Sequence, residues 1–359
     1  MRTIYLIRHG EPLFPHGERF CLSRTDLPLS PVGRMQGVLL RHWLADKPVS
    51  AVFHSELTRA AETAAFLSQR PKMAAELYEL GVGQWEGLSF QRIRAEYPAI
   101  YARRAEDPVA AQIPGGEVIP ACRDRVLRTF NELLEGTEGD LAVVAHAGVN
   151  RILLCDLLGR PLKQFLTIPQ PYGCVNILRL DRERLTVQEI GIRPRPALDD
   201  ALCRELLAAA NTPQRVQRHC EAAAKKAGEL AQRLSRAGLA LDMERLRSAA
   251  LLHDIARAER DHAAVGAGWL TALGYPEIAE LVAAHHELHD AQEAELAETS
   301  ILYLADKLIR EDQEVTLAQR FAASSEKLTD PAARLAHQRR YQQAQRVSRL
   351  LEQLTGEGD

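Results

Sequence analysis

The chain has 359 residues, a formal net charge of −3 and an isoelectric point near 6.5, and its length favours two domains. The nearly balanced charge excludes a protein that is drawn as a whole onto nucleic acid or an anionic membrane surface. Six scattered cysteines without a CxxC pair, and the lack of an apolar run of ~18 residues, favour a cytoplasmic protein with reduced thiols and no membrane helix.

Four short apolar runs, at residues 4–7, 49–53, 141–145 and 175–180, are typical of buried strands. Between them, Ser55 is a candidate cap for the helical pattern ELTRAAETAAFL, and GVNRILLCDLLG ends in a glycine suited to a helix C-terminus. This alternation predicts an α/β domain in which helices cover both faces of a mostly parallel sheet, in three layers. Ligands of such sheets bind outside the carboxyl ends of the strands, which is where His9 and His146 stand.

The pattern breaks around residues 193–213, where RPRPALDD and NTP interrupt it. From Pro213 onward, long stretches rich in alanine and leucine show helical periodicity and no convincing strand. We therefore expect a first domain at 1–195, a linker at 196–212 and an all-α second domain at 213–359, which closes with a long helix and a polar GEGD tail.

Charged and imidazole side chains follow three of the predicted strands. Arg8 and His9 follow the first, Arg59 follows the second, and His146 follows the third. Two guanidiniums offer rigid forks for phosphate oxygens, and two imidazoles offer a nucleophile and a donor. The set predicts a pocket that binds a phosphate dianion and accepts a phosphoryl group.

The motifs RHGE, DLPLSPVGRMQ, SELTRAAETA, ELGVGQWEGL, PGGE and VVAHAGVNR follow one another in order. With them, residues 1–192 resemble the histidine phosphatase superfamily, also called phosphoglycerate-mutase-like. The resemblance implies that His9 becomes the phosphohistidine, that Arg8, Arg59 and His146 hold the phosphate, and that Glu79 is the general acid, without a cofactor. Neighbouring arginines favour the neutral, nucleophilic form of His9.

Several positions leave alternatives open. Glu86 competes with Glu79 as the acid, and Arg24 and Glu117 either extend the pocket or form surface salt bridges. The family often has Asn a few residues after RHGE and the motif GGES later, whereas the corresponding segments here read LFPHGERF and GGEV. These differences concern substrate recognition more than phosphoryl transfer. The segments RFCLSRTDLPLS, GVNRILLCDLLG and IPQPYGCVNIL resemble α-ribazole phosphatase-like members. A mutase that moves phosphate within a sugar acid is an alternative, but the longer insertion that family mutases tend to carry before the second catalytic histidine is absent.

Six of the twelve histidines fall between residues 219 and 289, and His253 and Asp254 end the apolar run AALLHDIA. Asp306 lies in another apolar helical pattern, SILYLADKLI. Ionisable side chains on buried helices need partners, and a metal ion satisfies several at once. The spacing therefore predicts a metal site on helices.

Residues 212–325 resemble the HD-domain superfamily of metal-dependent phosphohydrolases. The resemblance places ligands at His219, His253, Asp254 and Asp306, and HAAVGAGWL and AAHHELHD add His262, His285 and His286, with Asp254 between two ions. Imidazoles and carboxylates together suit divalent iron, manganese, zinc or magnesium. His289 is more readily a surface residue, and Lys307 and Arg310 either contact a substrate phosphate or form a solvated helix face.

These patterns together predict a bifunctional phosphohydrolase that acts on small phosphorylated metabolites, with a phosphohistidine phosphatase followed by a metal-dependent hydrolase of a nucleotide-like substrate. An alternative makes the second domain a nucleotide sensor that regulates the phosphatase. The sequence leaves the oligomeric state, the metal and both substrates open.

Overall fold

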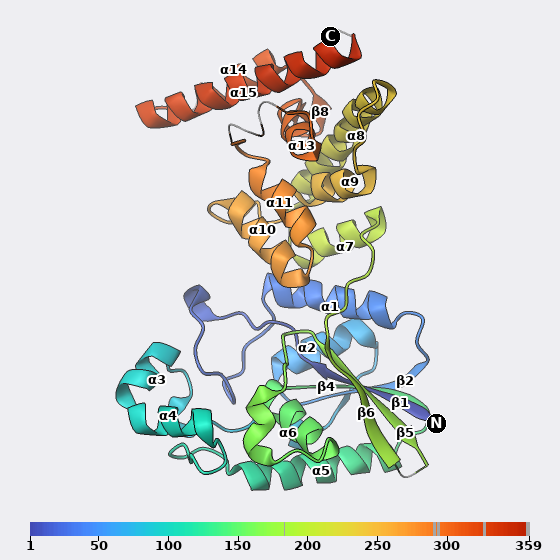
Figure 1. Ribbon diagram of the computed structural model, residues 1–359, viewed down its shortest axis with the longest axis vertical. Coiled ribbons are helices and arrows are strands. Elements are labelled where there is room, and N and C mark those ends of the chain that lie inside the picture. The colour runs from blue at the N-terminus through green and yellow to red at the C-terminus, as the bar shows by residue number, and fades with distance from the viewer. Residues whose placement is uncertain (183, 290–291, 293–294, 326–327, 357–359) are drawn as a thin grey trace. The chain divides into compact units, whose positions relative to one another are not determined.

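The computed structural model describes residues 1–182, 184–289, 292, 295–325 and 328–356. The chain divides into two compact units, Met1–Pro196 and Ala197–Asp359 (Figure 1). None of the described helices is both long and apolar enough to cross a bilayer. All six cysteines are free thiols.

One six-stranded sheet forms the centre of the first unit, in the order β3-β2-β4-β1-β5-β6. Its strands are β1 (Arg2–Arg8), β2 (Val49–His54), β3 (Lys72–Met73), β4 (Asp140–Ala145), β5 (Val175–Asp181) and β6 (Arg184–Ile192). β1 to β4 are parallel to one another, whereas β5 is antiparallel to both of its neighbours, β1 and β6. The predicted mostly parallel sheet is confirmed, and β3 and β6 extend it beyond the four expected strands.

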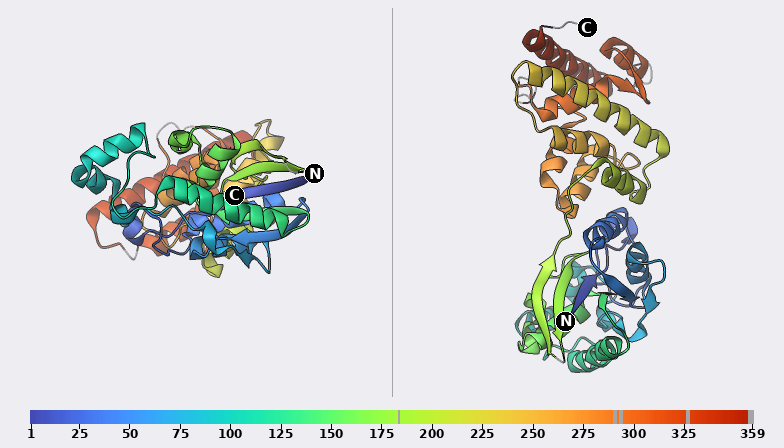
Figure 2. Two further views of the ribbon diagram at one scale, coloured as in Figure 1. Left: turned by 90° about the horizontal axis from the view of Figure 1, so that it is seen from below. Right: turned by 90° about the vertical axis from the view of Figure 1, so that its right-hand side faces the viewer.

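Helices cover both faces of this sheet (Figure 1; Figure 2). One face carries α1 (Pro31–Leu44) and α2 (Thr58–Leu67), and the other carries α5 (Ile119–Glu135) and α6 (Ala147–Leu157). α3 (Phe90–Glu96) and α4 (Pro98–Glu106) stand apart from the sheet and pack with Trp85 in a small core of their own (Figure 1). Side chains alternate along a strand, so β1 sends Tyr5 and Ile7 into a core with α1 and α2, and Ile4 and Leu6 into a core with α5 and α6. The three predicted layers are therefore present.

The register of the sheet decides which strand ends meet. Arg8 at the end of β1 pairs with Ala145 at the end of β4, so His9 and His146 follow at the same level. His54 at the end of β2 pairs with Val144 of β4, which places Ser55 close to His146. Parallel neighbours in register thus carry three polar side chains to one edge of the sheet.

The second unit is built almost entirely of helices. They are α7 (Asp200–Ala209), α8 (Gln214–Arg236), α9 (Met243–Leu252), α10 (His262–Leu273), α11 (Pro276–Ala284), α13 (Glu298–Lys307), α14 (Leu317–Ser325) and α15 (Pro331–Thr355). A two-stranded hairpin, β7 (Ile309–Arg310) and β8 (Gln313–Glu314), is a small addition to the predicted all-α domain. The helical domain is confirmed, and of the GEGD tail only Gly356 lies among the described residues.

Two local predictions differ from the structure. The expected linker, residues 196–212, contains α7, whose buried Leu202 and Leu206 give it an apolar face and which packs with α9 in the second unit. Ser55 is not a helix cap, because α2 begins at Thr58 with Leu57 as its N-cap. Its hydroxyl instead contacts His146, as described below.

Candidate active site and candidate metal centre

His9 and His146 lie together at the carboxyl edge of the sheet. Their ring centroids are 4.9 Å apart, and both side chains are buried. Nδ1 of His9 lies 2.7 Å from the carbonyl oxygen of Gly10. A carbonyl only accepts, so Nδ1 carries the proton and the lone pair of His9 is on Nε2. This is the tautomer that a nucleophilic imidazole requires.

The electrostatic surroundings keep His9 neutral. Burial, followed by the positive charges of Arg59 and Arg8, lowers the pKa of His9 well below its ordinary value. Burial and the neighbouring His9 and Arg59 lower the pKa of His146 in the same way. Both imidazoles are therefore unprotonated at neutral pH, as the sequence predicts for His9.

Arg8 is held beside His9 by an aromatic ring and a carbonyl. Its guanidinium lies 3.7 Å from the ring centroid of Tyr172, and Nη1 donates to the carbonyl oxygen of Gln170. The Tyr172 ring is also 5.6 Å from the ring of His9. The ring of Tyr172 therefore contacts both Arg8 and His9 and holds their side chains next to each other.

Arg59 is almost completely buried in the first turn of α2, with 1% of its surface exposed. Its Nη1 donates to the carbonyl oxygen of Thr25 at 2.9 Å, and its Nη2 donates to that of Ser23 at 2.7 Å. Among the described residues, Nε of Arg59 has no hydrogen-bond partner. A buried guanidinium with an unused donor is suited to an anionic ligand.

The two candidate acids have different surroundings. Glu79 accepts from the backbone N–H groups of Gly148 (3.0 Å) and Val149 (3.3 Å) in the first turn of α6, immediately after His146. Its charge also acts on Arg59. These contacts place the carboxylate of Glu79 beside the two histidines.

Glu86 instead holds a loop. It accepts from the backbone N–H groups of Ser23 at 2.9 Å and Thr25 at 3.1 Å, which are the residues whose carbonyls position Arg59. Burial would raise the pKa of Glu86, but these hydrogen bonds outweigh it and lower the pKa. Both carboxylates accept from backbone N–H groups, so their positions separate them. Glu86 is committed to the loop at residues 23–25, whereas Glu79 lies against the first turn of α6 next to His146, and the geometry therefore favours Glu79 as the acid.

Arg24 and Glu117 contact the segment of the chain around Glu79. Glu117 pairs with Arg125 through Nη2 at 2.9 Å, and also accepts from Gly81 N–H at 3.1 Å. Arg24 and Arg125 stack on the ring of Tyr78, at 3.5 and 3.7 Å from its centroid. Glu117 therefore braces the segment that carries Glu79, through contacts inside the protein.

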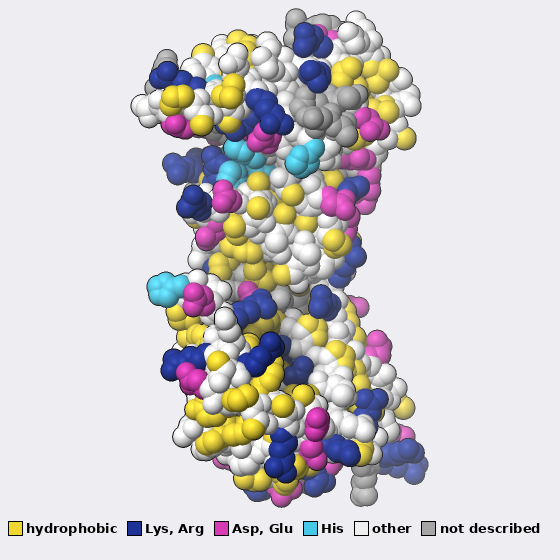
Figure 3. All heavy atoms as spheres, turned by 60° about the vertical axis from the view of Figure 1, so that its left-hand side comes forward, with side chains coloured by type: hydrophobic (Ala, Val, Ile, Leu, Met, Phe, Trp, Pro, Cys, Tyr) yellow, Lys and Arg dark blue, Asp and Glu magenta, His cyan; other side chains and the backbone are white. Residues whose placement is uncertain are grey.

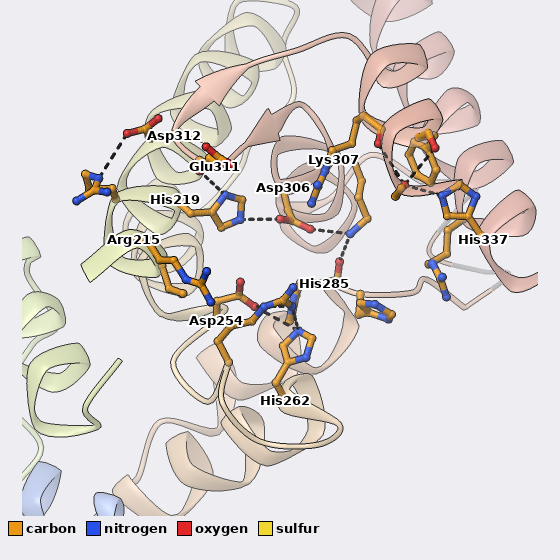
Figure 4. A pocket seen from close by; sticks show the side chains of 18 residues that line it. Arg215, His219, Asp254, His262, His285, Asp306, Lys307, Glu311, Asp312 and His337 are labelled. Atoms are coloured by element: carbon orange, nitrogen blue, oxygen red, sulfur yellow. Dashed lines mark hydrogen bonds and ion pairs between the residues drawn. The ribbon is translucent and has the colours of Figure 1, made fainter. Parts of the chain in front are cut away.

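The histidine-rich segment of the second unit forms two clusters of ligand atoms that share Asp254. One comprises His219, His253 and Asp254, and the other comprises Asp254, His262 and His285; within each, the ligand atoms lie within 4.8 Å of one another. Asp306 adjoins the first cluster, with Oδ1 2.9 Å from Nε2 of His219 (Figure 4). The same oxygen lies 3.6 Å from Nε2 of His253. These side chains come from α8, the end of α9, the start of α10, the end of α11 and α13.

Three of these histidines are oriented by backbone carbonyls. Nδ1 of His219 contacts the carbonyl oxygen of Glu311 at 2.8 Å, Nδ1 of His253 contacts that of Ala250 at 2.7 Å, and Nδ1 of His285 contacts that of Val282 at 2.6 Å. Each contact requires the proton on Nδ1, which leaves Nε2 as the ligand atom. Metal-binding histidines use their second nitrogen in this way.

The donor set fits divalent metal ions. Among the described residues, Nε2 of the fully buried His253 has no hydrogen-bond partner. Asp254 Oδ1 lies 3.2 Å from Nε2 of His262 and 3.6 Å from Nε2 of His285, close to the roughly 3.4 Å expected between two ligands on one tetrahedral ion with bonds of about 2.1 Å.

Ionised carboxylates complete this fit. Burial would raise the pKa of Asp254, but His253, His262 and His285 outweigh it and hold the pKa far below the ordinary range. The pKa of Asp306 is likewise lowered, because Lys307 and His219 outweigh its burial. Both groups are carboxylates, as metal ligands must be.

The remaining predicted residues lie at the edge of this centre. His286 is outside both clusters, although its ring centroid is 5.7 Å from that of His262. Lys307 donates to Asp306 Oδ2 at 2.6 Å and to the carbonyl oxygen of His285 at 3.1 Å. His289 is exposed, which fits its interpretation as a surface residue. Arg310 is also exposed but lies in β7 and not on the helix that carries Asp306, whereas Lys307 is buried, so these two residues do not form the solvated helix face that is one of their predicted alternatives.

Two residues of the first site escape sequence reasoning. Ser55 Oγ lies 2.6 Å from Nε2 of His146, and Tyr172 stacks on Arg8. The signal for Ser55 is its position directly after a buried strand, which we interpret as a helix cap. For Tyr172, PQPYG has only the pattern of a loop.

Comparisons with known proteins agree with this arrangement. Residues 4–193 match the model of the histidine phosphatase superfamily (branch 1), and residues 216–311 match that of the HD domain. Glucosyl-3-phosphoglycerate phosphatase of Mycolicibacterium vanbaalenii is 30% identical over 175 residues, which cover 45% of this chain and 76% of that protein. Phosphoserine phosphatase 1 of Hydrogenobacter thermophilus is 24% identical over 201 residues, 54% of this chain and 93% of that protein.

Among solved structures, the α-ribazole phosphatase of Shigella flexneri is 25% identical with a TM-score of 0.49, covering 55% of this chain and all of that one (100%). Each of the two family-model matches lies within one of the units described above, and the curated relatives of the first unit are named as phosphatases. The chain is therefore a phosphoric ester hydrolase that belongs to the histidine phosphatase superfamily and carries an HD domain after its phosphatase domain.

Proposed function

We propose that the chain is a bifunctional phosphohydrolase with two independent chemistries. The first unit would hydrolyse small phosphomonoesters through a phosphohistidine at His9, and the second would hydrolyse a nucleotide-like phosphoric ester at a divalent metal centre. The observation that carries the proposal is the neutral, Nδ1-protonated His9 with two arginines beside it. We further propose a cytoplasmic location.

In the first unit, Arg8 and Arg59 would bind the phosphate oxygens, and Nε2 of His9 would attack phosphorus. The bond from phosphorus to the alcohol oxygen would break as the bond to Nε2 forms, and Glu79 would protonate the leaving oxygen. The same carboxylate, then ionised, would take a proton from the water that releases phosphate. His146 would donate to the phosphoryl oxygens as their charge grows.

A leaving-group test separates the acid from the structural carboxylate. E79Q should lower kcat by roughly 10²-fold or more with an alkyl phosphate, and much less with p-nitrophenyl phosphate, because nitrophenolate departs without a proton. E86Q should lower both rates by the same factor, since it only loosens the loop that positions Arg59. Equal losses in E79Q for both substrates would exclude Glu79 as the acid.

The nucleophile has its own test. H9A should abolish hydrolysis of p-nitrophenyl phosphate, and the wild-type rate should survive a chelator, because the proposed steps of this unit use only side chains. Phosphoserine and α-ribazole 5′-phosphate belong in the substrate panel, the second because of the sequence resemblance. Full activity in H9A would remove His9 from its role.

In the second unit, His219, His253, Asp254, His262, His285 and Asp306 would hold the metal. Bound divalent ions would supply positive charge that neutralises a phosphate and lowers the pKa of water. The backbone carbonyls at Nδ1 would keep each Nε2 aimed at the centre, and Lys307 would orient Asp306. Iron, manganese, zinc and magnesium are the ions to test.

A further inference from the structure

The candidate metal ligands line one wall of a larger cavity. Its volume is about 730 Å³, which is within the range of pockets for drug-sized ligands and far more than one phosphate fills. Residues of α14 and α15, beyond the segment that matches the HD domain, form another wall. Figure 4 shows His337 on the side of the pocket opposite Arg215 and His219, with Lys307 between. The ligand of this cavity is therefore larger than the group at the metal ligands.

The wall formed by α14 and α15 is positively charged. Arg320 and Ser324 lie one turn apart on α14, and His337 and Arg340 lie three residues apart on α15, so that each pair shares a helix face. Ser324 Oγ lies 2.6 Å from Nε2 of His337, and the ring of Phe321 packs 5.1 Å from that of His337. These contacts join the two helix faces into one surface, which we call the α14–α15 wall.

Arg320 and Arg340 have no carboxylate partner within ion-pair distance among the described residues, although both are half-buried. Two other cations of the cavity are paired: Lys307 with Asp306 at 2.6 Å, and Arg218 with Asp312 at 3.5 Å. Burial and the charge of Arg340 lower the pKa of His337, which shows that the guanidinium charge reaches this ring. Unpaired, half-buried guanidiniums in a cavity favour an anion.

The surface view agrees with this distribution. Figure 3 shows histidine side chains of the second unit beside Lys and Arg side chains on one face. Four acidic residues line the cavity. Asp254 and Asp306 belong to the candidate metal centre, where bound metal ions would neutralise them, Asp312 pairs with Arg218, and Glu311 lies beside His219, away from the α14–α15 wall (Figure 4). A ligand would therefore meet positive charge at both ends.

We propose that the cavity binds a phosphoric ester that carries a second phosphate group, held by Arg320 and Arg340 on the α14–α15 wall while the first lies at the metal ligands. The proposal rests on the proposed function of this centre as a phosphohydrolase. Two guanidiniums form charge-assisted, forked hydrogen bonds to phosphate oxygens. The second phosphate belongs either to a continuous polyphosphate chain or to a separate position on the same molecule.

Binding to the full chain, measured by calorimetry, tests this proposal without relying on turnover. Methylphosphonate serves as the probe with one anionic group. Alkane-α,ω-diphosphonates of increasing length represent two separated groups, and linear polyphosphates represent a continuous chain. The manganese-loaded protein should bind at least one member of these series about tenfold or more tightly than methylphosphonate.

The variant pair R320Q/R340Q should lose this gain, whereas its affinity for methylphosphonate and its metal content should stay at wild-type values. R349Q is the matched control, because Arg349 is an exposed arginine of α15 outside the cavity, and it should keep the gain. The single variants R320Q and R340Q should each lose part of it, which protects the test if the pair fails to fold. The series that shows the gain identifies the source of the second phosphate.

A gain that persists in R320Q/R340Q, or no gain for any probe in the wild-type protein, would overturn the proposal. Failure of the proposed function of the metal centre has a different signature: the wild-type protein would bind no metal and show no metal-dependent hydrolysis of an ester. In that case the cations of the α14–α15 wall would still bind the diphosphonate or polyphosphate in the metal-free protein, and R320Q/R340Q would still weaken that binding.

Discussion

Replacement of Ser55 by alanine tests whether the contact between Ser55, which follows β2, and His146, which follows β4, determines the reactivity of the first site. Ser55 Oγ lies 2.6 Å from Nε2 of His146, and both residues are fully buried. Among the described residues, Nδ1 of His146 already lacks a partner, so S55A leaves both ring nitrogens unpaired. The ring then has no hydrogen bond that holds it against the phosphoryl group.

The magnitude follows from the buried hydrogen bond. A buried polar group without a partner costs about 1–3 kcal/mol. If the transition state bears that cost, kcat falls by roughly 5-fold to 150-fold. The inhibition constant of vanadate, which resembles the phosphoryl group in the transition state, should rise by a similar factor.

A matched variant separates reactivity from stability. S30A removes another buried hydroxyl, which caps α1 by accepting from Gly33 N–H at 3.0 Å, and it should lower Tm without changing kcat. Initial rates with p-nitrophenyl phosphate, vanadate inhibition and thermal melts complete the assay. Wild-type kcat and vanadate inhibition in S55A would refute the reasoning.

Three further predictions concern pH, metal and stacking. The pKa values of His9 and His146 are lowered in the folded protein, so below pH ~6.5 the unfolded chain binds more protons than the folded one. The contribution of these residues to stability is complete above that pH and is lost as the pH falls toward their folded pKa values. Tm should therefore drop between neutral and mildly acidic pH, and it should drop less in H9Q. An equal drop in H9Q would contradict the assignment. D254N should lose bound metal, measured by mass spectrometry, because Asp254 belongs to both ligand clusters. Its hydrolysis of p-nitrophenyl phosphate should stay unchanged. Wild-type metal content in D254N would show that the metal site lies elsewhere. Y172A should raise KM by roughly 2-fold to 30-fold, because it removes the ring that stacks on Arg8. Y172F keeps that ring and should keep the wild-type KM. Equal KM values in Y172A and the wild-type protein would show that the stacking is dispensable.

The sequence alone predicts the two kinds of domain and most residues that meet in each site. Strand and helix periodicity are local properties, so the runs before His9 and His146 identify strand ends, and the parallel arrangement implies that such ends share one edge of the sheet. The clustering of histidines between residues 219 and 289 is equally visible without coordinates. Residue type and spacing are sufficient for these conclusions because each rests on neighbours in the chain.

Only the tertiary structure decides what depends on contacts between distant segments. The register of β4 against β1 and β2 brings Ser55 to His146, and the loop after residue 168 brings Tyr172 to Arg8. The sequence does not separate Glu79 from Glu86. In the structure, Glu79 accepts from the first turn of α6 beside His146, whereas Glu86 binds the loop at residues 23–25.

The α14–α15 wall and helix α7 belong to the same class of features. Arg320 and Arg340 are 20 positions apart in the numbering and show no motif, and the sequence before Pro213 has the composition of a linker although α7 packs there. Packing energy depends on which surfaces are buried together, and that is determined by long-range contacts which local periodicity does not encode.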